Sequence, residues 1–156
     1  MLFAGLFCVV LFTSCKNKCG STTCQNGGTC ESNVCVCPIG YSGNACQTGW
    51  TDAVVGTYEC KRSLCNPKST DTLSWQSAIT KDATNSGYTI DISNFDRSNV
   101  TQYGTMDSLG NISIVPSVGY GVNATGTYLN GVVSLQFTTY NLGTLIYKCE
   151  MTMTKL

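Results

Sequence analysis

Six cysteines fall within the twenty-eight residues from Cys19 to Cys46, and this density constrains the fold more than any other feature of the chain. Successive cysteines are separated by four, five, four, one and eight residues. A segment this short cannot bury enough apolar surface to fold alone, so disulfide bonds must stabilise it, each by about 2–4 kcal/mol. The spacing by itself leaves the pairing of the six cysteines open.

Clustered cysteines can also hold zinc, which is the competing interpretation of this segment. The chain has no histidine and the cluster lacks the paired Cys-x-x-Cys motifs of zinc sites, so we expect no metal and no cofactor. Eleven cysteines in a chain of 156 residues point to an oxidising compartment. Basic and acidic residues number nine each, and this neutral balance gives no electrostatic case for a nucleic-acid partner.

Two motifs in the segment resemble the EGF-like domain. Residues 24–30 read Cys-x-Asn-Gly-Gly-Thr-Cys, and residues 35–46 read Cys-x-Cys-Pro-x-Gly-Tyr-x-Gly-x-x-Cys. We therefore expect an EGF-like domain at residues 19–47. The resemblance implies three disulfide bonds: Cys19–Cys30, Cys24–Cys35 and Cys37–Cys46.

Calcium is the ligand that many EGF-like domains bind, through acidic residues just before the first cysteine. Lys16 and Lys18 stand in that stretch here. Two cations at the expected ligand positions argue against a calcium site, because calcium takes oxygen ligands.

The N-terminus begins with an uncharged apolar run over residues 1–13. A membrane-spanning helix needs about twenty residues, whereas this length suits the apolar part of a secretory signal. The run ends in Phe12-Thr13-Ser14-Cys15, which resembles a bacterial lipobox. We predict a signal peptide at residues 1–14, lipid attachment at Cys15 and a linker at residues 15–18.

Ordinary signal cleavage near Ser14 is the alternative, with Cys15 as one more disulfide cysteine. The cysteine count favours this alternative. If Cys15 carries lipid and six cysteines belong to the EGF-like domain, then Cys60, Cys65 and Cys149 remain, and three cysteines cannot all pair.

Residues 51–156 have a different pattern, in which short segments alternate apolar and polar side chains, as half-buried strands do. These segments are residues 53–61, 73–80, 87–93, 99–106, 111–116, 122–129, 131–139 and 143–154. Turn residues separate them, and Asn130-Gly131 predicts a two-residue type I′ hairpin. No window shows a helical period. We predict an all-β fold whose second domain is an eight-stranded antiparallel up-and-down meander, closed into a barrel or curled into a sheet.

Large side chains are expected to fill the interior of this second domain, rather than to line a ligand cavity. The expected filling residues are Trp75, Tyr88, Tyr128, Phe137 and Tyr147.

The whole layout resembles small Gram-negative bacterial lipoproteins that join a lipobox, one EGF-like module and a lipocalin-like β domain. The β domain of such proteins begins near a Gly-Thr-Tyr, here residues 56–58. In a closed meander the first and last strands are neighbours, so Cys149 reaches either Cys60 or Cys65. Alternation supports Cys60, whereas the related proteins carry a cysteine just past the first strand. We predict the Cys65–Cys149 disulfide and a buried Cys60.

Catalysis is not expected, because a chain without histidine has no Ser–His or Cys–His mechanism. Five aspartates could in principle supply a carboxylate pair for glycoside hydrolysis, but their turn positions favour solvated roles. They are Asp71, Asp82, Asp91, Asp96 and Asp107. N-glycosylation sequons at Asn99, Asn111 and Asn123 matter only in a eukaryotic secretory pathway.

The predicted function is a non-catalytic binding or structural role for an exported protein, lipid-anchored to the bacterial cell envelope, most simply at the outer membrane. Its partners are the membrane, through the anchor, and a protein or glycan ligand. The alternative is a secreted eukaryotic EGF-like adhesion or signalling protein.

Overall fold

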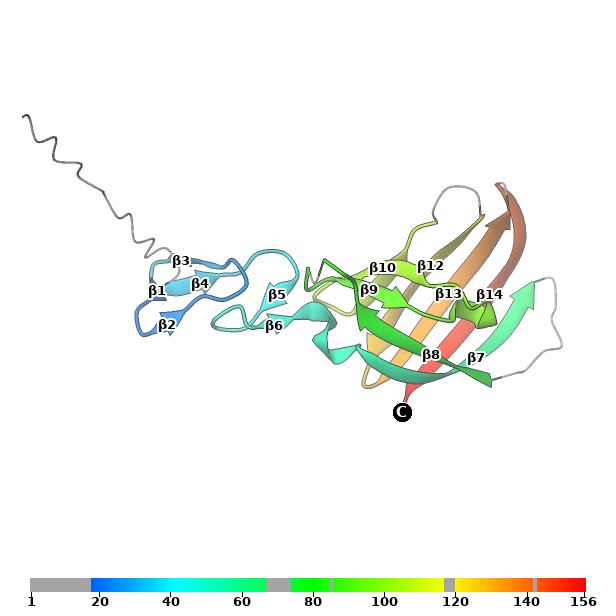
Figure 1. Ribbon diagram of the computed structural model, residues 1–156, viewed down its shortest axis with the longest axis horizontal. Coiled ribbons are helices and arrows are strands. Elements are labelled where there is room, and N and C mark those ends of the chain that lie inside the picture. The colour runs from blue at the N-terminus through cyan, green and yellow to red at the C-terminus, as the bar shows by residue number, and fades with distance from the viewer. Residues whose placement is uncertain (1–17, 67–73, 85, 117–119, 142) are drawn as a thin grey trace, which may run out of the picture.

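The chain folds into two units that follow each other, a small cystine-rich module and a closed β-barrel (Figure 1). The computed structural model describes residues 18–66, 74–84, 86–116, 120–141 and 143–156. The predicted signal segment, Cys15 and Lys16 lie outside the described residues. Within the described part of the chain, no helix is long and apolar enough to cross a membrane.

The module, residues 18–49, consists of three short antiparallel hairpins. Their strands are β1 (Lys18–Cys19) with β2 (Thr22–Thr23), β3 (Thr29–Glu31) with β4 (Val34–Val36), and β5 (Tyr41–Ser42) with β6 (Thr48–Gly49). The buried side chains of this unit are those of cysteines, and Tyr41 packs against them. The core of the module is therefore made of cystine sulfur and not of aliphatic side chains.

Backbone conformation and close packing explain why residues 26–28 of the module are Asn-Gly-Gly. Asn26 and Gly27 both have positive φ angles, of 49° and 80°, which asparagine and glycine tolerate. A Cβ atom on Gly28 would lie 2.8 Å from the Cys46 sulfur. The Asn26 side chain also donates a hydrogen bond to the Cys46 carbonyl at 2.8 Å, so this turn holds the last cysteine in place.

The barrel, residues 56–155, is a closed antiparallel meander, which confirms the predicted fold class. Its strands are β7 (Gly56–Asn66), β8 (Ser74–Lys81), β9 (Thr89–Ile92), β10 (Gln102–Met106), β11 (Asn111–Ile114), β12 (Tyr120–Leu129), β13 (Val132–Asn141) and β14 (Thr144–Lys155). Each strand pairs with the next, and β14 pairs with β7 to close the barrel. Closure leaves no free sheet edge.

The barrel interior is filled with side chains, but not with the set expected from the sequence. Phe137 is buried as predicted, together with Tyr58 and Phe95, which were not among the expected filling residues. The other expected residues, Trp75, Tyr88, Tyr128 and Tyr147, are only partly buried. Tyr128 and Tyr147 each use the hydroxyl in a hydrogen bond, to Ala53 and to Asp96. Such polar tips keep tyrosines at the ends of an apolar core.

A short turn closes the barrel end that lies farther from the module. This turn contains the 3-10 helix η3 (Phe95–Arg97), and Asn94, Asp96 and Arg97 in it have positive φ angles. Phe95 is 1% exposed and packs edge-on against Phe137 of β13, with ring centroids 5.2 Å apart. The turn also contacts β7, β8 and β14 through hydrogen bonds, so it covers the barrel mouth as a plug.

The junction between the two units is tightly packed. The 3-10 helix η2 (Trp50–Ala53) connects them; the Trp50 amide donates to the Gly40 carbonyl at 2.9 Å, and the Thr51 amide donates to the Gly87 carbonyl at 3.1 Å. Gly40 and Gly87 face each other so closely that a Cβ on Gly87 would lie 2.6 Å from the Gly40 oxygen. The backbones of module and barrel therefore meet directly, and the module projects from one end of the barrel (Figure 1).

Candidate functional site

Three disulfide bonds hold the module, and they are the pairs that the EGF-like resemblance implies. They are Cys19–Cys30, Cys24–Cys35 and Cys37–Cys46, with Cα–Cα distances of 5.2, 5.6 and 5.2 Å. These separations are ordinary for protein disulfides.

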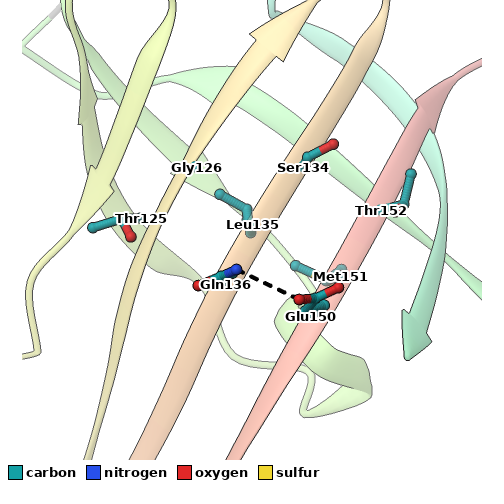
Figure 2. A pocket seen from close by; sticks show the side chains of 8 residues that line it. All are labelled: Thr125, Gly126, Ser134, Leu135, Gln136, Glu150, Met151 and Thr152. Atoms are coloured by element: carbon teal, nitrogen blue, oxygen red, sulfur yellow. Dashed lines mark hydrogen bonds between the residues drawn. The ribbon is translucent and has the colours of Figure 1, made fainter. Parts of the chain in front are cut away.

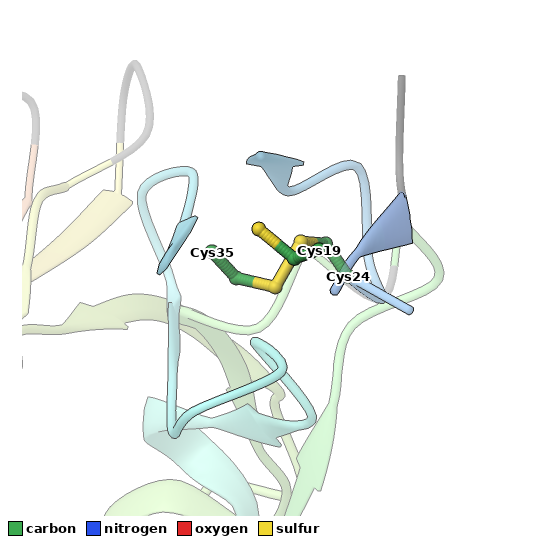
Figure 3. Close-up of side chains that lie close together, drawn as sticks. All are labelled: Cys19, Cys24 and Cys35. Carbon is green, nitrogen blue, oxygen red and sulfur yellow. A yellow bond between two sulfur atoms is a disulfide. The ribbon is translucent and has the colours of Figure 1, made fainter. Parts of the chain in front are cut away.

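A metal site is the other use that this sulfur cluster could have. The sulfurs of Cys19, Cys24 and Cys35 lie within 4.8 Å of one another (Figure 3). Cys24 and Cys35 are bonded to each other, and Cys19 is bonded to Cys30. Metal binding needs thiolates, and disulfide sulfurs carry no such charge. The proximity of the three sulfurs follows from adjacent cystines.

The fourth disulfide, Cys65–Cys149, joins β7 to β14, the first and last strands of the barrel. Cys60 is a free cysteine and is fully buried. Alternation places Cys60 on the inner face, but register decides the partner, because Cys60 lies level with Met153 and not with Cys149. Burial raises the pKa of the Cys60 thiol to about 11, which keeps it protonated and unreactive.

The aspartates weighed as carboxylate pairs differ in their surroundings. Asp71 lies outside the described residues. Asp107 accepts backbone hydrogen bonds from Leu109 and Asn111 in a turn, as the solvated interpretation expects. Asp82 and Asp91 line one hollow on the barrel wall.

Asp96 is not a solvated turn residue, which corrects the sequence interpretation. Its side chain is 5% exposed and forms an ion pair with Arg62 at 2.9 Å. The Tyr147 hydroxyl donates to the same carboxylate, and Arg62 lies 5.8 Å from the centre of the Tyr147 ring. Burial, and then the Asp96 carboxylate, raise the pKa of Tyr147 to about 12. Through these contacts with Arg62 and Tyr147, Asp96 holds the plug against the barrel wall.

The three sequons have exposed asparagines in the structure, at Asn99, Asn111 and Asn123. The Asn111 amide is already engaged, because it donates to Asp107 at 2.7 Å.

One hollow on the outer barrel wall has a volume of about 380 Å³ and lies over β12, β13 and β14 (Figure 2). The exposed side chains around it are short or polar, and Gln136 donates to Glu150 across it at 3.4 Å. Ligand pockets are typically apolar with a few polar groups, and this hollow contains no aromatic side chain.

Another hollow, here called the Asp91 hollow, has a volume of about 230 Å³ and lies over β9, β10 and β11. It combines two carboxylates, of Asp82 and Asp91, with the ring of Tyr103 and the side chain of Val115. Its residues come from separate strands, so sequence spacing gave no signal for it.

The module exposes its few large aliphatic side chains. Val34, Val36 and Ile39, which are all the valines and isoleucines of residues 18–49, are 65%, 46% and 73% exposed. Val34 and Val36 are alternate residues of β4 and therefore share one face of the hairpin.

Comparison with known proteins finds an EGF-like domain at residues 19–54. Protein NEL of Gallus gallus is 43% identical over 55 residues, which is 34% of this chain and 7% of that protein. Fibulin-7 of Homo sapiens is 51% identical over 35 residues, covering 20% of this chain and 8% of the relative. The cadherin EGF LAG seven-pass G-type receptor 2 of Rattus norvegicus is 49% identical over 35 residues, covering 20% and 2%.

The chain thus spans less than a tenth of the length of the curated relatives that it matches. These relatives are animal proteins and not bacterial lipoproteins. No solved structure matches the chain.

Proposed function

We propose that the chain is a secreted EGF-like binding protein, in which the module contacts a protein partner and the barrel holds the module in a fixed orientation. The animal proteins that match support a secreted protein over the bacterial lipoprotein that the sequence analysis put first. The cystines of the module support an oxidising compartment.

The exposed aliphatic side chains of the module carry this proposal. Val34, Val36 and Ile39 contribute little to a core made of cystines, and exposed apolar groups of this kind are typical of contact surfaces. The filled barrel supports the same division of labour, because Tyr58, Phe95 and Phe137 occupy space that a ligand cavity would need.

The test compares a module variant with a barrel variant. In the full chain, Val34→Ser combined with Ile39→Ser should keep all the disulfides but lose most of the saturable binding of labelled protein to animal cells. Leu109→Ser, at a position 83% exposed on the barrel, is the matched control and should bind like the wild type. Equal binding by the module variant would contradict the proposal.

Lipid anchoring through Cys15 is the second candidate, and the cysteine pairing favours it. The odd cysteine that counted against lipidation is accounted for by Cys60, which is buried and free. The other described cysteines pair among themselves, so they offer Cys15 no partner.

Palmitate labelling of the chain, expressed with its own N-terminus in a bacterium, separates the two candidates. Anchoring predicts label and membrane fractionation that both disappear in Cys15→Ser. Unlabelled protein in the medium, for the wild type and the variant alike, supports the secreted form.

Calcium binding is not part of the proposed function. Titration calorimetry on the full chain should show no heat at about millimolar calcium, the weak end of the range for extracellular modules. A binding isotherm would show that the lysines before Cys19 do not prevent calcium binding.

A further inference from the structure

The Asp91 hollow brings two kinds of side chain together on the outer barrel wall. Asp91 of β9 and Tyr103 of β10 are direct cross-strand partners. Gly104 pairs with Ile114 at the end of β11, so Val115, the residue after β11, comes opposite Tyr103. Tyr103 is 68% exposed and Val115 is 76% exposed, and both line the hollow with the carboxylates of Asp82 and Asp91.

The Asp91 carboxylate lacks a partner for part of its hydrogen-bonding capacity. Its Oδ1 atom is buried, yet it accepts no hydrogen bond from any residue that the structure describes. Burial, and then the charge of Asp82, raise the pKa of Asp91. A buried acceptor without a donor destabilises a protein, and a second negative charge nearby adds to the cost.

A basic side chain of the same surface does not relieve this charge. Lys81 follows Thr80, the β8 partner of Asp91, but its ammonium group is bound to Asp52 at 2.5 Å. The Asp82 carboxylate accepts hydrogen bonds from Thr84, so the Asp91 Oδ1 atom is the acceptor that remains for a donor from outside the chain.

We propose that the Asp91 hollow binds the side chain of an arginine presented by a protein partner. A planar guanidinium supplies donors to the Asp91 carboxylate while it stacks on the exposed ring of Tyr103. The aliphatic stem of the same arginine lies against Val115. A lysine ammonium is a compact point charge that cannot stack in this way, and a volume of about 230 Å³ suits one long side chain.

This site extends the binding role to the barrel and does not depend on the apolar face of the module. The two surfaces belong to different units, so variants of one leave the other intact. Failure of the module variant in the cell-binding experiment says nothing about the Asp91 hollow.

The experiment is an NMR titration of the full chain with acetyl-arginine amide, and with acetyl-citrulline amide as the uncharged isostere. The arginine probe should shift the backbone amides of Asp91, Tyr103 and Thr105, with a dissociation constant on the order of millimolar for a single side chain. Citrulline should shift them at least tenfold more weakly. Added salt should weaken the arginine complex, because exposed charges are screened.

Two variants identify the groups that bind. Asp91→Asn should weaken binding of the arginine probe about tenfold, because a hydrogen bond to a charged group is lost. Tyr103→Ala should weaken binding about threefold, as expected for an exposed cation–π contact. Glu59→Gln removes one exposed carboxylate from β7, away from the hollow, and should leave binding unchanged.

Three results would overturn the proposal. They are equal binding of citrulline and arginine, unchanged binding by both Asp91→Asn and Tyr103→Ala, and shifts of these amides by a neutral sugar such as glucose when arginine gives none.

Discussion

The module and the barrel achieve a fixed structure by different means. The buried side chains of the module are those of cysteines, whereas the barrel buries a cluster that includes Tyr58, Phe95, Phe137 and several isoleucines. The barrel contains one disulfide bond, Cys65–Cys149, whereas the much shorter module contains three. The contrast shows how covalent cross-links replace apolar burial when a unit is too short to form a core.

Reduction of the disulfide bonds should have the largest effect, because it should unfold the module and leave the barrel folded. With the disulfides reduced, the module should lose all stable structure, because each bridge contributes about 2–4 kcal/mol and little else is buried. The barrel should remain folded at moderate temperature. NMR spectra with and without reductant report both units at once, and loss of the barrel signals in parallel would show that the barrel also depends on its cystine.

Truncation of the plug should do the reverse and destabilise the barrel while the module keeps its structure. Phe95→Ala should destabilise the barrel by about 3–5 kcal/mol, because it empties a buried aromatic site. The module disulfides should still form. Denaturant unfolding followed by tryptophan fluorescence measures the loss, with the exposed Leu109→Ala as the control at under about 0.5 kcal/mol.

The ion pair of the plug should contribute less than its aromatic anchor. Asp96→Asn keeps the shape but leaves Arg62, whose side chain is 16% exposed, without a counter-charge. We expect a loss of about 2–3 kcal/mol, below the range for a fully buried pair. Glu59→Gln, an exposed carboxylate on the same strand as Arg62, should cost under about 0.5 kcal/mol in the same unfolding measurement.

The junction between the units should respond to one added methyl group. Gly87→Ala combines an unfavourable positive φ of 80° with a Cβ only 2.6 Å from the Gly40 oxygen. Gly143→Ala has the same conformational problem, with φ at 81°, and open space around it. The control should lose about 1 kcal/mol and Gly87→Ala about 2 kcal/mol. Nitrogen-15 relaxation should also show the module tumbling separately only in Gly87→Ala.

The smallest effect should come from the exposed ion pair of Lys81 and Asp52, whose side chains are 38% and 39% exposed. The hydrogen bond from Lys81 lowers the pKa of Asp52 from 3.8. A lowered folded-state pKa adds stability above the unfolded pKa, and this stability is lost as the pH falls through the folded value. Lys81→Met should therefore cost under about 1 kcal/mol near neutral pH and nothing in strong acid. A constant difference across the pH range would contradict this assignment.

Sequence patterns predicted the strands of the barrel well, because the signals are local. Alternation identified the strands, and Asn130 and Gly131 have the positive φ angles, 49° and 83°, that a type I′ hairpin needs. The η3 plug escaped prediction because Phe95 is a single apolar residue among turn residues, with no period around it. It shortens the expected strand at residues 99–106, which begins at Gln102.

The sequence pattern did not predict which residues of different strands lie beside each other. Alternation identifies the face of Cys60 and Cys149 correctly, but only the register of β7 against β14 places Cys149 beside Cys65. The Asp91 hollow has the same origin, because Asp91, Tyr103 and Val115 come from different strands. Nothing in the spacing of these residues along the chain relates them.

The Cys65–Cys149 bond also determines how the barrel bears a mechanical load. A pull between the module and Lys155 acts at the same end of the seam between β7 and β14, so the hydrogen-bonded pairs of the seam break one after another. The cystine lies at the other end of that seam, where Lys148 pairs with Asn66. Separation of the two strands therefore stops at a covalent bond, after most of β7 has come apart from β14. When the load is released, the strands are still linked in register and can pair again.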